Sequence, residues 1–209
     1  MNAAPIDKLA AFWNQRYAAE EFAYGIEPND FLVSVMPQFV PGGSLLCLAD
    51  GEGRNGVWLA RQGFSVTSID IAERGLDKAS ALATRYGVSI QTRHADLASC
   101  DLGIEAWDVI ISIFLHLPKR VRQDLHRRCV AALRPGGLMV FEAYGTGQAG
   151  RGTGGPPEPQ LLAAIDDLEQ EFPGCQSLHR HVGLREVHEG RHHDGLGEVV
   201  QILAQKPGR

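Results

Sequence analysis

Apolar runs bounded by turn residues alternate with segments of helical periodicity along most of the chain, a pattern typical of strands joined by helical crossovers. Glycines stand where the first two helical segments end, which suits a left-handed helix stop. After a loop rich in glycine and proline (145–159), two extended segments are expected to pair as an antiparallel hairpin. The pattern predicts strands over 44–49, 64–70, 88–94, 107–115, 138–144, 177–188 and 198–205, and helices over 55–62, 73–86, 118–133 and 160–172.

This alternation indicates an α/β fold: a mostly parallel sheet with helices on both faces and an antiparallel last strand. We expect one domain over residues 1–209, made of an N-terminal helical region (1–40), a central core (41–144) and a C-terminal loop, helix and hairpin (145–209). In such a sheet, a ligand binds outside the carboxyl ends of the strands.

Composition narrows the class of protein. Apolar residues make up 44% and charged residues 22% of the 209 residues, which is ordinary for a globular chain. The net charge of −5 argues against nucleic acid as a partner, and no apolar stretch approaches the length of a membrane span. The N-terminus shows no secretory pattern, and the four cysteines lack a C-x-x-C pair. We therefore expect a cytoplasmic protein with reduced thiols and no metal site, in an oligomeric state that the sequence leaves open.

The sharpest local signal is LLCLADGEGRNG, in which a buried strand runs into Gly51-x-Gly53-x-x-Gly56 and then a helix. Glycine lets a ligand approach the backbone closely, and helix N-terminal amides face the ligand. Asp70 ends the next strand, where a carboxylate can accept hydrogen bonds from two ribose hydroxyls. The pattern predicts a cofactor that contains adenosine, with a tight structural turn as the alternative. Asn55 is expected to cap the following helix.

Charge selects among such cofactors. Asp50 and Glu52 would face the pyrophosphate of a dinucleotide with two more negative charges, and one such contact near 4 Å costs about 4 kcal/mol at an effective dielectric of ~20. The sulfonium and ammonium groups of S-adenosylmethionine would instead be attracted. We therefore expect S-adenosylmethionine, and we keep a nicotinamide-dependent oxidoreductase as the less favoured alternative.

The sequence resembles the class I S-adenosylmethionine-dependent methyltransferases, and within them a small bacterial group related to the tellurite-resistance and thiopurine methyltransferases. The resemblance extends over nearly the whole chain and is carried by FWNQRY, FAYGIEPNDFL, DGEGRNGVWLA, VTSID, HADL, ISIFLHLP, LRPGGLMVFEAY, GTGGPPEPQLL and EGRHHDGLGEVVQILAQK. It implies a Rossmann-like, seven-stranded sheet in the order 3-2-1-4-5-7-6, with strand seven antiparallel and helices on both faces.

The resemblance also implies which residues bind the cofactor. Gly51 and Gly53 would pass under its methionine part, and Asp70 would bind the ribose. The adenine ring would lie between two short segments, and the backbone after the fourth strand would line the methionine amino group. These further positions are Ile71, Asp96 and Leu97 for the adenine, and Ile113 and Phe114 for the amino group.

An N-terminal lid is implied by the same resemblance. It would close over cofactor and substrate and contains Trp13, Arg16, Tyr17 and Tyr24, with Arg16 as the partner of the cofactor carboxylate. Ordinary packing of an amphipathic helix is the alternative for Trp13.

The first glycine motif departs from the usual pattern at two positions. Cys47 stands in place of an acid and Ala49 in place of a glycine, and we do not expect Ala49 to adopt the backbone angles that glycine allows. This departure leaves open a cofactor-poor or non-catalytic methyltransferase-like binding protein.

The methyl acceptor is expected to be a small molecule, either a soft thiol or chalcogen or an anionic compound. Five of the eight histidines fall between His179 and His193, interleaved with arginines. This segment is either a solvated hairpin rim or a cationic wall that faces the acceptor, and His188 and Arg191 are then the candidate catalytic residues. His116, just past the fourth strand, is the third, with ordinary packing as the alternative. A soft acceptor such as a thiolate, selenide or telluride needs little help from a base, whereas a hydroxyl or amine would require one, with His116 or His188 as candidates.

Overall fold

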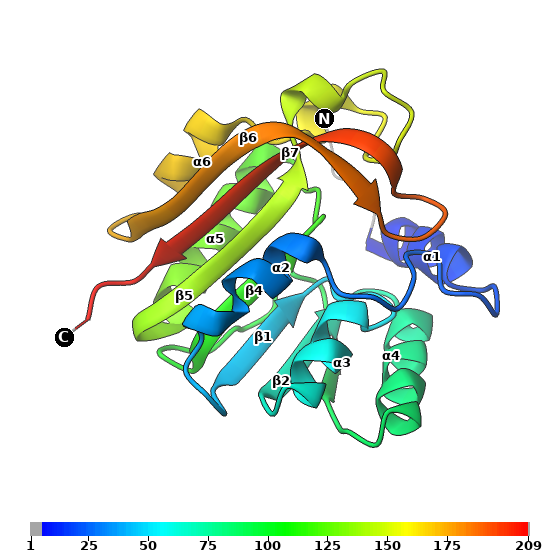
Figure 1. Ribbon diagram of the computed structural model, residues 1–209, viewed down its shortest axis with the longest axis horizontal. Coiled ribbons are helices and arrows are strands. Elements are labelled where there is room, and N and C mark those ends of the chain that lie inside the picture. The colour runs from blue at the N-terminus through cyan, green and yellow to red at the C-terminus, as the bar shows by residue number, and fades with distance from the viewer. Residues whose placement is uncertain (1–5, 209) are drawn as a thin grey trace.

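Seven strands form one mixed sheet in the order β3-β2-β1-β4-β5-β7-β6 in the computed structural model, which describes residues 6–208 (Figure 1). β7 runs antiparallel to both of its neighbours, so the predicted order and direction are confirmed. The strands are β1 (Ser44–Leu48), β2 (Ser65–Asp70), β3 (Gln91–His94), β4 (Trp107–Ile113), β5 (Leu133–Tyr144), β6 (Gln176–His188) and β7 (Asp194–Gln205). The helices are α1 (Ile6–Arg16), α2 (Asp30–Val35), α3 (Arg54–Arg61), α4 (Glu73–Arg85), α5 (Lys119–Ala132) and α6 (Ile165–Glu171), with 3₁₀ turns η1 (Met36–Gln38), η2 (Thr146–Gln148) and η3 (Pro159–Leu161).

Helices cover both faces of the sheet because the central strands are apolar on both sides. In β1, Leu45 and Cys47 pack toward α2 and α3, whereas Leu46 and Leu48 pack toward α5 and α6. Figure 1 shows α2 and α3 in front of the sheet and α5 behind it. Among the described helices, none is long and apolar enough to cross a membrane.

The three largest differences from the predicted bounds are at the starts of β5, α6 and β7. β5 begins at Leu133, before the Arg-Pro-Gly-Gly turn, where a register shift lets Leu133 pair with Trp107. α6 begins only at Ile165, since the preceding residues form η3 around Pro159. β7 begins at Asp194 although its first residues are polar, because they pair with the end of β6.

The turn after β1 has the left-handed backbone that its glycines predict. Gly51 and Gly53 have φ of 56° and 83°, and a side chain at Gly56 would collide with the Asp50 carboxylate and the Ser68 hydroxyl. Ala49 also has a positive φ, of 49°. Our expectation for Ala49 was therefore wrong: alanine adopts the angles of the usual glycine at this position, at a cost in strain of about 1–2 kcal/mol.

Replacing Ala49 with glycine should relieve this strain. Because glycine also gains entropy in the unfolded chain, we expect Ala49→Gly to raise the free energy of unfolding by only about 0.5–1 kcal/mol. The control is Ala81→Gly, in the exposed middle of α4, which should lower it by about 1 kcal/mol. Urea denaturation measures both, and equal destabilisation by the two changes would contradict the strain at Ala49.

Candidate functional site

The acidic side chains of the glycine turn point into the protein. Asp50 accepts hydrogen bonds from the Ser68 hydroxyl (2.6 Å) and the Gly56 N–H (3.3 Å), and burial raises its pKa to about 7. Glu52 is 4% exposed, accepts from the Ala23 N–H and pairs with Lys78 at 2.5 Å. Both carboxylates are therefore bound by groups of the protein itself. The prediction that Asp50 and Glu52 face the cofactor is wrong, and the choice between cofactors cannot rest on their charge.

Asp70 lies at the carboxyl end of β2, as predicted, and joins two backbone segments of the site. One carboxylate oxygen accepts from the Gly51 N–H and the other from the Ala72 N–H, both at 2.8 Å. Burial raises the pKa of Asp70, and these backbone donors act in the opposite direction. Each carboxylate oxygen has a second lone pair, so Asp70 retains the capacity to accept from ribose hydroxyls.

The positions predicted to contact adenine follow β2 and β3, which are neighbours in the sheet. The Ile71 carbonyl lies 3.0 Å from Nε2 of His94, at the end of β3. Asp96 accepts from the Ala98 N–H at 2.9 Å, which leaves its other carboxylate oxygen for a ligand, and Leu97 is buried beside it. The structure thus places Ile71, Asp96 and Leu97 just past the carboxyl ends of β2 and β3.

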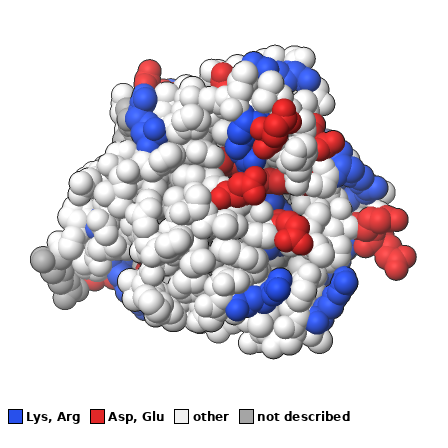
Figure 2. Space-filling model, in the orientation of Figure 1, with Lys and Arg blue, Asp and Glu red and all other residues white. Residues whose placement is uncertain are grey.

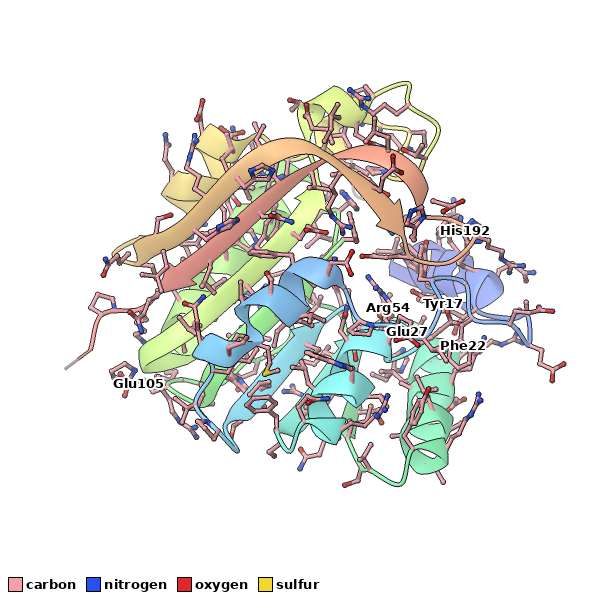
Figure 3. All side chains as sticks on the ribbon, in the orientation of Figure 1. Tyr17, Phe22, Glu27, Arg54, Glu105 and His192 are labelled. Carbon is pink, nitrogen blue, oxygen red and sulfur yellow. The ribbon has the colours of Figure 1, made fainter. Side chains whose placement is uncertain are left out.

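The end of α1 and the segment after it pack over the carboxyl ends of β1 and β2. Tyr17 is buried, and its ring would touch a side chain at Gly51 or at Gly75. Trp13 stacks on Tyr17 with ring centroids 5.8 Å apart, and Arg16 donates to the Tyr24 hydroxyl at 3.1 Å. In the view of Figure 3, Tyr17 lies below His192, which is on the turn between β6 and β7. The predicted lid residues therefore lie together beside the glycine turn.

Aromatic side chains in contact with one another connect the lid residues to the carboxyl ends of β4 and β5. We call Tyr24, Phe114, Tyr144 and His193 the aromatic wall. The His193 ring lies 4.7 Å from Tyr24, 4.6 Å from Phe114 and 5.2 Å from Tyr144, measured between centroids. Phe114 follows β4 directly and has a φ of 52°, a strained conformation of the kind that clusters at functional sites. The wall is uncharged when His193 is neutral, and burial lowers the pKa of His193.

The three predicted catalytic residues lie in different surroundings. His116 stacks on Tyr144, and its Nε2 accepts from the Tyr144 N–H at 3.2 Å; burial lowers its pKa to about 3. The side chain of His188 is 71% exposed, and its hydrogen bond to Asp194 raises its pKa. Arg191 is exposed on the same turn. His116 thus lies against the aromatic wall, whereas His188 pairs with Asp194 on the exposed surface of the hairpin.

A buried network of charges lies behind the wall. Glu142 and Glu189 are 0% and 6% exposed, and the Asn29 amide donates to both at 2.8 Å. Arg185 donates to both carboxylates as well, and Arg54 donates to Glu189 at 2.5 Å. Burial acts to raise the pKa of Glu189, but the two arginines, together with His193 and Asn29, lower it to about 2. Figure 2 shows charged side chains gathered on the right of the view, where the hairpin meets α2 and α3.

Asn55 connects this network to the N-terminal segment. Its side-chain oxygen accepts from the Asn29 N–H at 2.9 Å, while Gly53 occupies the N-cap of α3. The prediction that Asn55 caps α3 is therefore wrong. Asn29 is itself the N-cap of α2, since its side chain accepts from the Leu32 N–H.

Sequence reasoning missed His193, Glu189 and Arg54 as site residues. Glu189 and His193 stand four residues apart in the polar run HEGRHHDG, which looked like a solvated rim. The signal that could have separated them from His188 is the glycine at 190, whose φ of 71° turns the chain back toward Tyr24.

Residues 45–137 match the family described as "Methyltransferase domain". This segment runs from β1 through the glycine turn to the start of β5 and contains Asp70, Asp96 and Phe114. The central part of the chain is thus similar to a methyltransferase domain, a class of enzyme whose methyl donor is S-adenosylmethionine. No curated protein matches the chain by sequence.

Solved structures share the fold over nearly the whole chain. TehB from Haemophilus influenzae is 18% identical with a TM-score of 0.71, and the match covers 94% of this chain and 66% of TehB. The N-methyltransferase NodS from Bradyrhizobium japonicum is 15% identical with a TM-score of 0.65, and the match covers 99% of each chain. The [4+2]-cyclase SpnF is 16% identical with a TM-score of 0.69, over 100% of this chain and 99% of its own. At these identities the likeness shows the fold alone.

The buried network should stabilise the hairpin, which Arg185→Leu tests. This change leaves Glu142 and Glu189 buried without one of their cations, so we expect the free energy of unfolding to fall by about 3–5 kcal/mol. The matched control is Arg180→Leu on the same strand, whose partner Asp166 is 86% exposed; it should cost less than about 1 kcal/mol. Similar losses in urea denaturation would contradict the assigned role of the network.

Proposed function

We propose that the chain transfers the methyl group of S-adenosylmethionine to a small-molecule acceptor held against the aromatic wall. The observation that carries this proposal is the position of Asp70: its carboxylate joins the Gly51 and Ala72 backbones at the carboxyl ends of β1 and β2, within the segment that matches a methyltransferase domain. The cofactor would lie along this edge, from the adenine side at Ile71 and Asp96 to the methionine side at Ile113 and Phe114.

Positioning supplies most of the catalysis in such a reaction. An acceptor atom held in line with the sulfonium methyl gains roughly 7–11 kcal/mol from orientation alone. The lid residues Trp13, Tyr17 and Tyr24 would cover both reactants, since they already pack against the strand ends. Arg16 would reach the cofactor carboxylate by exchanging its bond to the Tyr24 hydroxyl.

Two of the expected acceptor classes differ in how well they suit the site. A soft thiol or chalcogen suits the aromatic wall, because polarizable sulfur packs favourably against aromatic rings. An anionic acceptor would need cations of the hairpin beside the aromatic wall, but the His188 imidazole pairs with Asp194 and Arg185 pairs with buried carboxylates. A third cation, Arg191, is exposed on the turn of the hairpin. We therefore favour a thiol or chalcogen acceptor. The departures at Cys47 and Ala49 leave the turn intact, since Ala49 takes the required backbone angle.

Calorimetry with S-adenosylhomocysteine and with NADH tests the cofactor assignment. We expect binding of the first and none of the second. Asp70→Ala should weaken the first by about 1–3 kcal/mol, or about 5- to 150-fold, because it removes a charged acceptor.

Asp77→Ala is the control, since Asp77 is an exposed acid of α4, and it should leave the affinity unchanged. Because Asp70 also binds two backbone N–H groups, thermal unfolding of Asp70→Ala and Asp70→Asn shows whether each variant is folded at the temperature used. A folded Asp70 variant that binds as tightly as the wild type would contradict the ribose assignment.

A further inference from the structure

The His193 imidazole is the titratable group at the centre of the aromatic wall. It is 8% exposed and contacts rings from the N-terminal segment, from the residue after β4 and from the end of β5. Phe114, one of its neighbours, is predicted to line the methionine part of the cofactor. His193 is therefore close to the place where the methyl group would leave.

The two nitrogens of His193 have different surroundings. Nδ1 is buried without a hydrogen bond and lies 3.9 Å from Oε2 of Glu189, an ion-pair distance that is too long for a hydrogen bond. Because the pKa of Glu189 is lowered to about 2, this carboxylate is ionised, and it favours the tautomer that carries its hydrogen on Nδ1. The lone pair then resides on Nε2, which has no hydrogen bond within residues 6–208.

Several charged or titratable groups face this imidazole from the elements packed around it. Glu189 favours the protonated ring, whereas burial and the nearby cations oppose it, so the ring is neutral at pH 7. These groups are Arg16 and Tyr24 from the N-terminal segment, Arg54 from α3, His116 after β4, Tyr144 from β5, and Glu189 and His192 from its own turn.

We propose that His193 is the general base of the proposed methyl transfer and that the acceptor is a neutral thiol, which binds with its proton in place. The sulfur of the acceptor forms a bond to the methyl carbon while the bond from that carbon to the sulfonium breaks. The electron pair of the broken bond stays on the cofactor sulfur and gives S-adenosylhomocysteine. The thiol proton passes to Nε2 of His193, the imidazolium pairs with Glu189, and the proton leaves to water on product release.

The match in proton affinity favours a thiol over an alcohol. The pKa of His193 is lowered below the usual 6.5 of a histidine, so it lies more than about 2 units below the pKa of a thiol near 8.5. Proton transfer that is concerted with methylation can bridge such a gap. The pKa of a phenol, near 10, is further from that of His193, and the pKa of an aliphatic alcohol is further still. Glu189 acts as a positioning residue, because it orients the ring and stabilises its charged form.

The test compares two thiols of similar size, benzyl mercaptan, which keeps its proton at neutral pH, and thiophenol, which ionises more readily. With benzyl mercaptan, His193→Gln should lower kcat by about 10²- to 10⁴-fold and abolish the inflection of kcat/KM that the wild type shows below pH 6.5. With thiophenol the loss should be much smaller. His181→Gln, an exposed histidine of β6, is the matched control and should change neither rate.

Two further measurements separate a base from a structural residue. Glu189→Gln should move the inflection of kcat/KM to lower pH, because it removes the charge that favours the imidazolium. In the wild type, ¹⁵N spectra of the imidazole should show the hydrogen on Nδ1, a result that needs no variant to fold. A hydrogen on Nε2 would overturn the proposal.

The inference rests on the proposed function, and the outcomes distinguish the two. If S-adenosylhomocysteine fails to bind the wild type, the proposed function itself fails. If it binds, then equal rates for His193→Gln and the wild type with benzyl mercaptan overturn the role of His193. Benzyl alcohol is included as a third acceptor. The neutral-thiol acceptor is overturned if only thiophenol is methylated, if benzyl alcohol is preferred to both thiols, or if none of the three compounds is methylated.

Discussion

Glu142 and Glu189 are carboxylates buried behind the site, and the protein must neutralise them where water cannot reach. Arg185 and Arg54 supply the charge and the Asn29 amide supplies further hydrogen bonds. These five residues come from β5, from the turn between β6 and β7, from β6 itself, from α3 and from the cap of α2. A buried charge with a missing partner is strongly unfavourable, so the network fixes how these segments meet.

The network determines which parts of the chain can form the two halves of the site. Arg54 begins α3 within the glycine motif, and Glu189 begins the turn that carries His193. Most of the residues proposed to bind the cofactor, including Asp70 and Asp96, lie within the segment that matches a methyltransferase domain, 45–137. Three residues of the aromatic wall, Tyr24, Tyr144 and His193, lie outside that segment. On the proposed function, the acceptor would therefore be selected largely by parts of this chain that the family match does not cover.

Local patterns were sufficient to predict the strands and the antiparallel hairpin, because strand and helix periodicity and glycine positions are local properties. The order of the strands was implied by the family resemblance. They also placed Asp70 at the end of β2. Properties that depend on tertiary partners could not be predicted in this way. Asp50 and Glu52 were expected to face a ligand, yet Ser68, Gly56, Ala23 and Lys78 occupy them. Asn55 and His193 likewise owe their roles to residues far away in sequence.

A crystal structure of the complex with S-adenosylhomocysteine tests the central claim most directly, namely that the segments held by the network form one site with a donor half and an acceptor half. We expect the ribose hydroxyls on the Asp70 carboxylate and the cofactor sulfur beside Phe114, directed toward Nε2 of His193. A nucleoside bound away from Asp70, or a sulfur directed toward the outer surface of the hairpin at His188, would contradict this account.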